Sequence, residues 1–291
     1  MATSNSIFKT PELEKLYMAL YEVVLTKWNV PMASLDITTR YGITHINTCG
    51  SINNPPMILF PGFGANSAMW YPNVGALSSK FRIYAIDTNG QPGKSISRQK
   101  LTASNSADWI AEVLNVLRLE KVFIAGISLG GWLTLNFALH KPERVNCVVL
   151  LDPAASLEKM GTSFLQRSFM PIMLHPTRSN LVKYFRWMTQ GYDVDPDWGE
   201  LMLQGILNIR PQPPIRAGVF TDSELRSVKV PVLVLIGEHS VIYHPQRTYE
   251  RALRLIPNVQ AEIIPAASHA LNSQKADYVN ARILKFCLNL Y

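Results

Sequence analysis

The sequence predicts an α/β fold in which a mostly parallel β-sheet carries helices on both faces. Short and nearly continuous apolar runs recur along the chain, and such runs are typical of strands that are covered on both faces. Helical stretches separate most of the runs, and this alternation implies right-handed crossovers between parallel strands. The 291 residues, 47% hydrophobic and 17% charged, have a globular composition that excludes a disordered, collagen-like or coiled-coil chain.

The first elements are expected to be a helix and a hairpin. Thr10 is a suitable N-cap and Pro11 a suitable first helical residue, and apolar side chains then recur at helical spacing over residues 11–28. We expect this amphipathic helix to pack on the body of the protein, with binding to a partner as the alternative. Residues 34–40 and 43–48 flank a Tyr-Gly pair, which predicts an antiparallel hairpin.

Six strands and five helices are expected after the hairpin. The strands are the apolar runs at residues 57–60, 81–86, 122–125, 145–151, 230–236 and 261–264. The helices are expected at residues 65–79, 106–119, 131–140, 246–255 and 274–288.

The alternation stops between residues 156 and 221, a segment that we interpret as a helical lid inserted after the sixth strand. This lid segment has no strand pattern and holds five of the ten methionines together with several Phe and Trp residues. Such side chains suit either the core of a packed lid or an apolar binding surface, and lid core is the simpler interpretation. Residues 1–155 and 222–291 would then form the α/β core.

The net charge of +7 does not by itself indicate a nucleic-acid partner or an anionic surface. The 28 Lys and Arg residues are spread singly, so a solvated basic surface explains them. No apolar run reaches about 18 residues, and no membrane span is expected. Residues 1–15 lack the apolar stretch of a signal peptide, so the cytoplasm is the expected compartment. Three scattered cysteines are too few for a disulfide framework or a zinc cluster.

Residues 126–130, Gly-Ile-Ser-Leu-Gly, carry the sharpest chemical signal. An apolar strand precedes them and a helix follows, which is the context of a nucleophile on a tight strand-to-helix turn. Such a turn strains the backbone, so the residues two before and two after the nucleophile must be small. The pattern predicts Ser128 as the nucleophile and the N–H of Leu129, at the helix start, as an oxyanion donor.

A second oxyanion donor and a base are expected at two other strand ends. The sequence Phe-Pro-Gly-Phe-Gly at residues 60–64 follows the first parallel strand, where the N–H of Phe63 could donate; an ordinary glycine turn is the alternative. His269 lies in the loop after residues 261–264, and a serine hydroxyl needs an imidazole to accept its proton. The rival histidines are His45, His140, His175, His239 and His244.

Together these motifs resemble the α/β-hydrolase superfamily and, within it, the bacterial carboxylesterases that include the naproxen esterases. The similarity covers nearly the whole chain from about residue 38. It is carried by residues 57–64, 67–73 (Ser-Ala-Met-Trp-Tyr-Pro-Asn), 126–131, 220–225, 237–239 and 267–269. The resemblance implies an α/β-hydrolase fold and hydrolysis of a small-molecule ester without a cofactor or a metal. It also implies Ser128 as nucleophile, His269 as base, and the N–H groups of Phe63 and Leu129 as the oxyanion hole.

Two positions depart from the family pattern. Pro61 stands where the family usually has a histidine of the scaffold, so activity should survive. Ser240 stands where the family has the acid that orients the base, and a neutral hydroxyl cannot stabilise an imidazolium as a carboxylate does.

The identity of the acid is therefore open. Asp152 follows the strand at residues 145–151, and other α/β-hydrolases resemble this arrangement in taking their acid from that strand end. Glu238 is the rival, although it would need a rearranged loop to reach the base. The third alternative is that no carboxylate acts, with Asp152 only capping the start of the lid.

Other functions stay possible at this stage. A lactonase, thioesterase, C–C hydrolase or perhydrolase could use the same triad on another substrate. Ser240 also motivates a hydrolase fold that has lost turnover and only binds a ligand. Because the lid segment is rich in Met and aromatic residues, we expect an apolar, aryl or medium-chain acyl or alcohol group. The sequence does not determine the oligomeric state.

Overall fold

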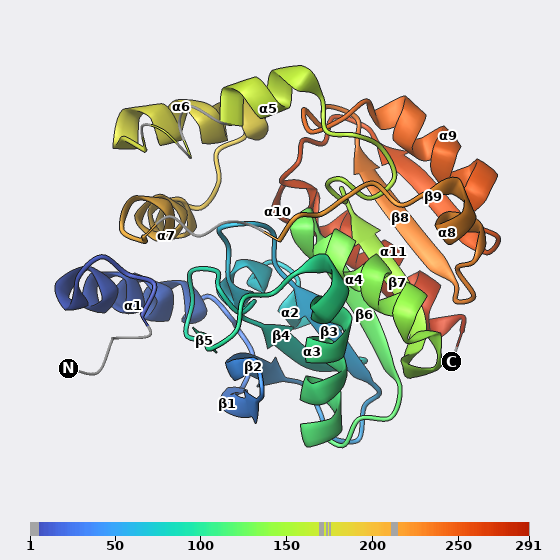
Figure 1. Ribbon diagram of the computed structural model, residues 1–291, viewed down its shortest axis with the longest axis horizontal. Coiled ribbons are helices and arrows are strands. Elements are labelled where there is room, and N and C mark those ends of the chain that lie inside the picture. Colours follow the sequence, from blue (N-terminus) through green and yellow to red (C-terminus); the bar gives the residue numbers. More distant parts are fainter. Residues whose placement is uncertain (1–5, 169–171, 173, 175, 211–214, 291) are drawn as a thin grey trace.

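The structure is a computed structural model that describes residues 6–168, 172, 174, 176–210 and 215–290 (Figure 1). Within these residues one nine-stranded sheet has the order β1-β2-β4-β3-β6-β7-β8-β9, and β5 pairs with β2 off this path. The pairs β1–β2, β2–β4 and β2–β5 are antiparallel, and the pairs from β4 through β9 are parallel. The predicted hairpin and mostly parallel sheet are therefore present.

The strands agree closely with the apolar runs. They are β1 (Met32–Thr39), β2 (Gly42–Cys49), β3 (Pro56–Phe60), β4 (Arg82–Ile86), β5 (Ile96–Ser97), β6 (Val122–Ile127), β7 (Val145–Leu151), β8 (Val232–Gly237) and β9 (Val259–Ile264). Strand β5 was not predicted, because two residues are too few for a periodic pattern to be recognised.

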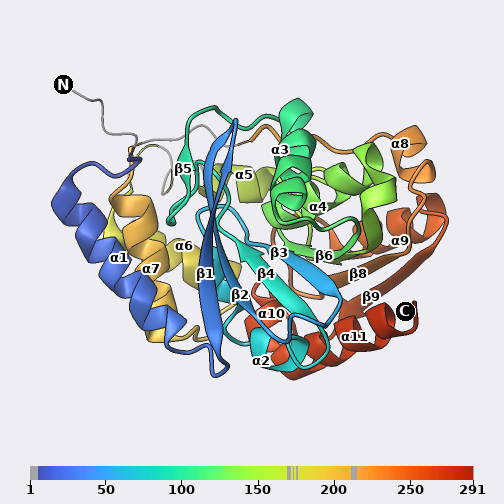
Figure 2. The ribbon, with the colours of Figure 1, turned by 90° about the horizontal axis from the view of Figure 1, so that it is seen from below.

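Alternate residues of the central strands face two separate apolar clusters, so helices cover both faces of the sheet (Figure 2). One face packs against α3 (Ala103–Val116), α4 (Leu129–His140), α8 (Asp222–Arg226) and α9 (Pro245–Leu255). The other packs against α1 (Pro11–Leu25), the 3-10 helix η1 (Ser67–Trp70), α2 (Val74–Leu77), α10 (Leu271–Gln274) and α11 (Ala276–Leu288). A second 3-10 turn, η2 (Pro142–Arg144), precedes β7.

The prediction of one helix over residues 65–79 was wrong. The chain forms η1 and α2 there instead, because Asn66 caps η1 with its side chain and Pro72 lies between the two short elements. Asn73 then holds this corner by donating to the carbonyl of Asn272 at 2.9 Å and to Asn280 at 2.8 Å. The side-chain hydrogen bonds fix the two short turns in place of a continuous helix.

Other helices differ from prediction in their bounds. The N-terminal helix ends at Leu25 rather than residue 28, and α3 covers residues 103–116 rather than 106–119. The helix expected over residues 274–288 begins at Ala276 as α11, and the short α10 ends before it at Gln274. These differences lie at helix ends, where fraying and capping make boundaries hard to infer from periodicity.

The described part of the lid segment is helical, with α5 (Thr162–Ser168), α6 (Arg178–Met188) and α7 (Pro196–Leu207). Helix α7 packs alongside α1 (Figures 1 and 2). Lys27, just after α1, forms ion pairs with Asp195 and Asp197 at the start of α7, at 2.9 and 2.8 Å. The N-terminal helix therefore contacts both the lid segment and the α/β core.

Candidate active site

Ser128 occupies a strained turn between β6 and α4. Its φ of 55° and ψ of −119° lie in a region that L-residues rarely adopt. A Cβ on Gly126 would overlap the Gly130 carbonyl oxygen, and one on Gly130 would overlap the Phe60 carbonyl oxygen. The Gly-x-Ser-x-Gly spacing thus has the steric cause that the sequence analysis assumed.

The N–H groups of Leu129 and Phe63 were predicted to form the oxyanion hole, and both residues lie beside Ser128. Leu129 is the first residue of α4, so its N–H belongs to the first turn, whose N–H groups have no acceptor within the helix. The loop holding Phe63 abuts the serine, since a Cβ on Gly62 would lie 3.4 Å from Ser128 Cβ. Gln91 accepts a hydrogen bond from the Gly64 N–H at 2.8 Å and holds this loop.

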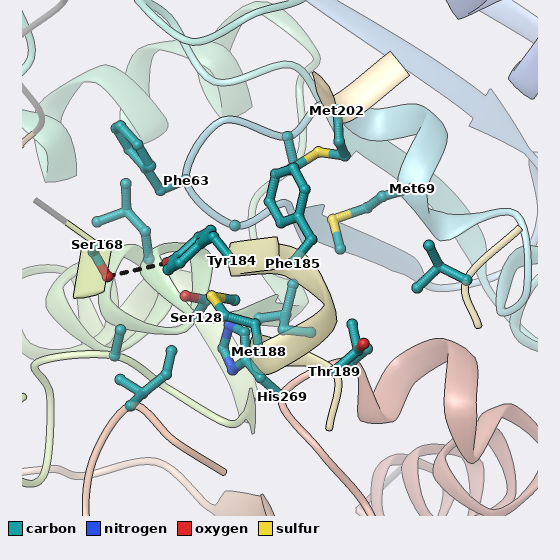
Figure 3. A pocket seen from close by; sticks show the side chains of 18 of the residues that line it. Phe63, Met69, Ser128, Ser168, Tyr184, Phe185, Met188, Thr189, Met202 and His269 are labelled. Carbon is teal, nitrogen blue, oxygen red and sulfur yellow. Dashed lines mark hydrogen bonds between the residues drawn. The ribbon is translucent and has the colours of Figure 1, made fainter. Parts of the chain in front are cut away.

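His269 follows β9, and the parallel sheet places it at the same cavity as Ser128. Both side chains line this cavity and are labelled in Figure 3. His269 Nδ1 lies 2.6 Å from Asp152 Oδ2. Because the two ring nitrogens point in divergent directions, Nε2 faces away from Asp152.

Asp152 is fully buried at the end of β7, with a φ of 42°. Besides His269, three groups contact its carboxylate: Tyr243 O–H at 2.7 Å, Ser240 O–H at 2.6 Å and Gly237 N–H at 3.2 Å. Burial and the neighbouring Asp152 charge raise the pKa of Tyr243 well above its usual range, so this phenol stays protonated and can donate.

The rival acid Glu238 points elsewhere. Its carboxylate is half-exposed and accepts a hydrogen bond from the Ala266 N–H at 2.8 Å. Ser240, in contrast, lies at the site and donates to the carboxylate oxygen that faces His269. The structure therefore brings Asp152, not Glu238, to the imidazole.

The rival histidines lie outside this arrangement. His45 Nδ1 pairs with Asp36 at 2.7 Å, and His140 Nδ1 lies 2.8 Å from the Asn136 carbonyl oxygen. His239 and His244 are exposed on the loop after β8. His175 lies outside the described residues.

A cavity of about 780 Å³ opens in front of Ser128 and His269. Its wall is mostly apolar, and the lid segment contributes Met202, Phe185 and Tyr184 (Figure 3). Tyr184 accepts a hydrogen bond from Ser168 at 3.2 Å, and burial raises its pKa to about 12. The size and lining are those of a site for a small apolar molecule.

The structure gives no sign of a metal centre or a membrane span in the residues that it describes. No group of three or more His, Cys, Asp or Glu side chains among them is arranged to hold a metal ion. No helix in the same part of the chain is long and apolar enough to cross a bilayer.

Comparison with known proteins decides the family. A family model described as alpha/beta hydrolase fold matches residues 55–193. The chain is 37% identical to a Bacillus subtilis protein named uncharacterized carboxylesterase nap, over 97% of each chain. It belongs to the α/β-hydrolase family. The fold expected from the sequence is thereby confirmed.

Two further similarities to α/β-hydrolases extend over most of the chain. The B. subtilis carboxylesterase YbfK is 37% identical, over 94% of this chain and 93% of its own. The crystal structure of naproxen esterase (carboxylesterase NP) from B. subtilis superposes with a TM-score of 0.87 at 34% identity, covering 98% of this chain and 99% of the other. The resemblance to the group that includes the naproxen esterases is thus confirmed.

Sequence reasoning missed the two hydroxyls that hold Asp152. Ser240 was noted as a departure from the family pattern, but not as a donor to another carboxylate. Nothing in the sequence pointed to Tyr243. It lies 91 positions after Asp152 in the chain, and only the folded loop after β8 brings the two side chains together.

Proposed function

We propose that this α/β-hydrolase is a carboxylesterase that hydrolyses esters of apolar or aryl acids or alcohols through an acyl-enzyme. One arrangement carries the proposal. Ser128, on its strained turn, and His269 both line the cavity, and behind them the buried Asp152 lies 2.6 Å from His269 Nδ1. A serine at a cavity, an imidazole and an orienting carboxylate are the parts that nucleophilic acyl transfer needs.

In the proposed reaction, Ser128 Oγ attacks the ester carbonyl carbon while His269 Nε2 takes the hydroxyl proton. The N–H groups of Phe63 and Leu129 stabilise the oxyanion of the tetrahedral intermediate. His269 then protonates the departing alkoxide, and an acyl-enzyme remains on Ser128. Water, activated by the same imidazole, attacks the acyl carbon and releases the acid. Asp152 holds the ring and stabilises the imidazolium in both halves.

The size and lining of the cavity support the substrate class. About 780 Å³ can enclose an aryl or medium-chain group, and Met69, Met202 and Phe185 provide an apolar wall. In Figure 3 the two methionines lie on the side of the cavity away from Ser128 and His269. The names of the relatives, two carboxylesterases and a naproxen esterase, support the same class.

A fluorophosphonate probe tests the nucleophile. The native enzyme should be labelled covalently at neutral pH, and the Ser128→Ala variant should not be labelled and should not hydrolyse 4-nitrophenyl or naphthyl esters. A Ser227→Ala variant, whose exposed hydroxyl bonds only within α8 and its cap, is the matched control and should label normally. Absence of labelling in the native protein would instead support a ligand-binding homologue without turnover.

The choice among ester, lactone, thioester and C–C substrates needs a direct comparison. The proposal predicts that kcat/KM is highest for carboxylic esters with an apolar or aryl group. A higher value for any of the other three classes would reassign the substrate while leaving the triad in place.

A further inference from the structure

The Asp152 carboxylate has a complete set of donors. An ionised carboxylate offers about four lone-pair sites, two on each oxygen. Oδ1 accepts from Tyr243 O–H and Gly237 N–H, whereas Oδ2 accepts from Ser240 O–H and contacts His269 Nδ1. Every site is therefore used.

This saturation fixes the orientation of the carboxylate. If the carboxylate turned, at least one of the four donors would lose its partner. Asp152 is fully buried, and Ser240 and Tyr243 are 7% and 5% exposed. A donor displaced in such a place has little access to water, which makes the loss costly.

The two oxygens are held differently. On Oδ1, the Tyr243 phenol and the Gly237 N–H fix the orientation of the carboxylate from the side away from the imidazole. On Oδ2, the Ser240 hydroxyl shares the oxygen with His269 and draws off part of its negative charge. Tyr243 thus governs direction, and Ser240 governs how strongly the oxygen attracts the imidazolium proton.

We propose that Ser240 and Tyr243 are positioning residues of the esterase reaction, which keep the Asp152 carboxylate aimed at His269 and set how strongly its oxygen attracts the imidazolium proton. This inference rests on the proposed function. Tyr243 and His269 are the titratable groups that contact the Asp152 carboxylate in the described part of the chain.

Steady-state kinetics of Tyr243→Phe and Ser240→Ala test the proposal. Each hydrogen bond to a charged group is worth a factor of about 10 to 100, so Tyr243→Phe should lower kcat about tenfold or more with KM within about twofold. Ser240→Ala should move the acidic limb of the kcat/KM profile to higher pH, because a carboxylate with fewer donors favours the imidazolium more. Ser240→Thr, which keeps a hydroxyl, should retain the native profile.

Tyr278→Phe is the matched control. It removes a tyrosine hydroxyl that donates to a carboxylate, Glu262 Oε2 at 2.8 Å, on the exposed side of α11. Its kinetics and pH profile should equal those of the native enzyme. Unchanged kcat in Tyr243→Phe together with an unchanged acidic limb in Ser240→Ala would overturn the proposal.

Proton NMR separates failure of this inference from failure of the proposed function. The His269 Nδ1–H proton bound to Asp152 should give a downfield resonance, identified by its loss in His269→Gln. Ser240→Ala and Tyr243→Phe should each shift this resonance, and Tyr278→Phe should not, whether or not the protein hydrolyses any ester. No shift in either variant would show that the two hydroxyls have no influence on the Asp152–His269 pair.

Discussion

At the scale of single residues, the turn at Ser128 depends on two glycines that leave no room for a side chain. We expect Gly130→Ala to destabilise the fold by about 1–3 kcal/mol, because the new methyl group overlaps the carbonyl oxygens of Phe60 and Pro61. It should also lower kcat, since those carbonyls belong to the loop that carries Phe63. Denaturant unfolding and ester hydrolysis measure both effects. Gly218→Ala, whose Cβ meets nothing within 4 Å, is the control that should show neither.

Asp152 is the residue whose role the structure makes easiest to test. Asp152→Asn keeps the shape but removes the charge that would stabilise the imidazolium, so kcat should fall on the scale of ~10⁴. Glu238→Gln should change kcat less than threefold, because that carboxylate bonds to the Ala266 N–H instead. A loss under tenfold in Asp152→Asn would remove Asp152 from the triad.

The Ser240 position permits a test of where the acid can be placed. Ser240 Oγ lies 2.6 Å from Asp152 Oδ2, the same oxygen that contacts His269 Nδ1. A carboxylate at 240 should therefore reach the imidazole, and Asp152→Asn with Ser240→Asp should recover at least tenfold of the kcat lost in Asp152→Asn alone. Equal kcat for the single and double variants would show that position 240 cannot supply the orienting charge.

At the scale of elements, α7 links the cavity to the loop that carries Phe63. A Cβ on Gly64 would lie 3.7 Å from Ile206 and 4.0 Å from Met202, so this helix packs against the loop that carries Phe63. The same helix rests on α1 through the Lys27 ion pairs. The helical segment after β7 thus lines the cavity and also contacts the loop that carries Phe63.

Filling the cavity from α7 should change substrate choice. We expect Met202→Trp to lower kcat/KM for naphthyl esters about tenfold relative to acetyl esters of small alcohols, because the larger ring occupies volume that the aryl group needs. Leu253→Trp, at an exposed position of α9, should leave the ratio unchanged. Kinetics measured in parallel on the two ester series give the ratio of their kcat/KM values. An equal fall in kcat/KM for both series would show that Met202 does not line the space occupied by the aryl group.

At the scale of the whole molecule, several buried tyrosines should make the folded state less stable as the pH rises into the alkaline range. Burial raises the pKa of Tyr184 to about 12, and burial together with the Asp87 charge raises the pKa values of Tyr17 and Tyr21 above the usual range. Above pH about 10 the unfolded chain releases protons that the folded chain retains. The unfolded state then binds fewer protons, so the free energy of unfolding should fall as pH rises from about 10 towards the raised values.

Within that range, each such tyrosine should lower the free energy of unfolding by about 1.4 kcal/mol per pH unit. Denaturant unfolding at pH 9, 10 and 11 measures the slope, and Tyr184→Phe should make the decline shallower. A free energy of unfolding that stays constant from pH 9 to 11 would contradict the retention of these protons.

The sequence by itself determined the α/β architecture and the family. Continuous apolar runs at residues 57–60 and 145–151 and the Gly-x-Ser-x-Gly turn are local patterns, since each follows from sterics within a few neighbouring residues. The prediction failed where the apolar periodicity was weak. Residues 65–79 form two short elements with Pro72 between them, and hydrogen bonds from Asn73 to Asn272 and Asn280, about 200 positions away, hold this corner.

Only the tertiary structure decided which carboxylate meets the imidazole. Asp152, Ser240, Tyr243 and His269 come from the ends of three different parallel strands, and no local pattern reports how side chains from separate strands converge. The sheet registers β7, β8 and β9 so that their carboxyl ends share one edge, and the hydrogen bond from the Ala266 N–H holds Glu238 away from the imidazole. The distance between each carboxylate and the imidazole is set by the packing of the whole sheet, and it cannot be read from the order of residues in the chain.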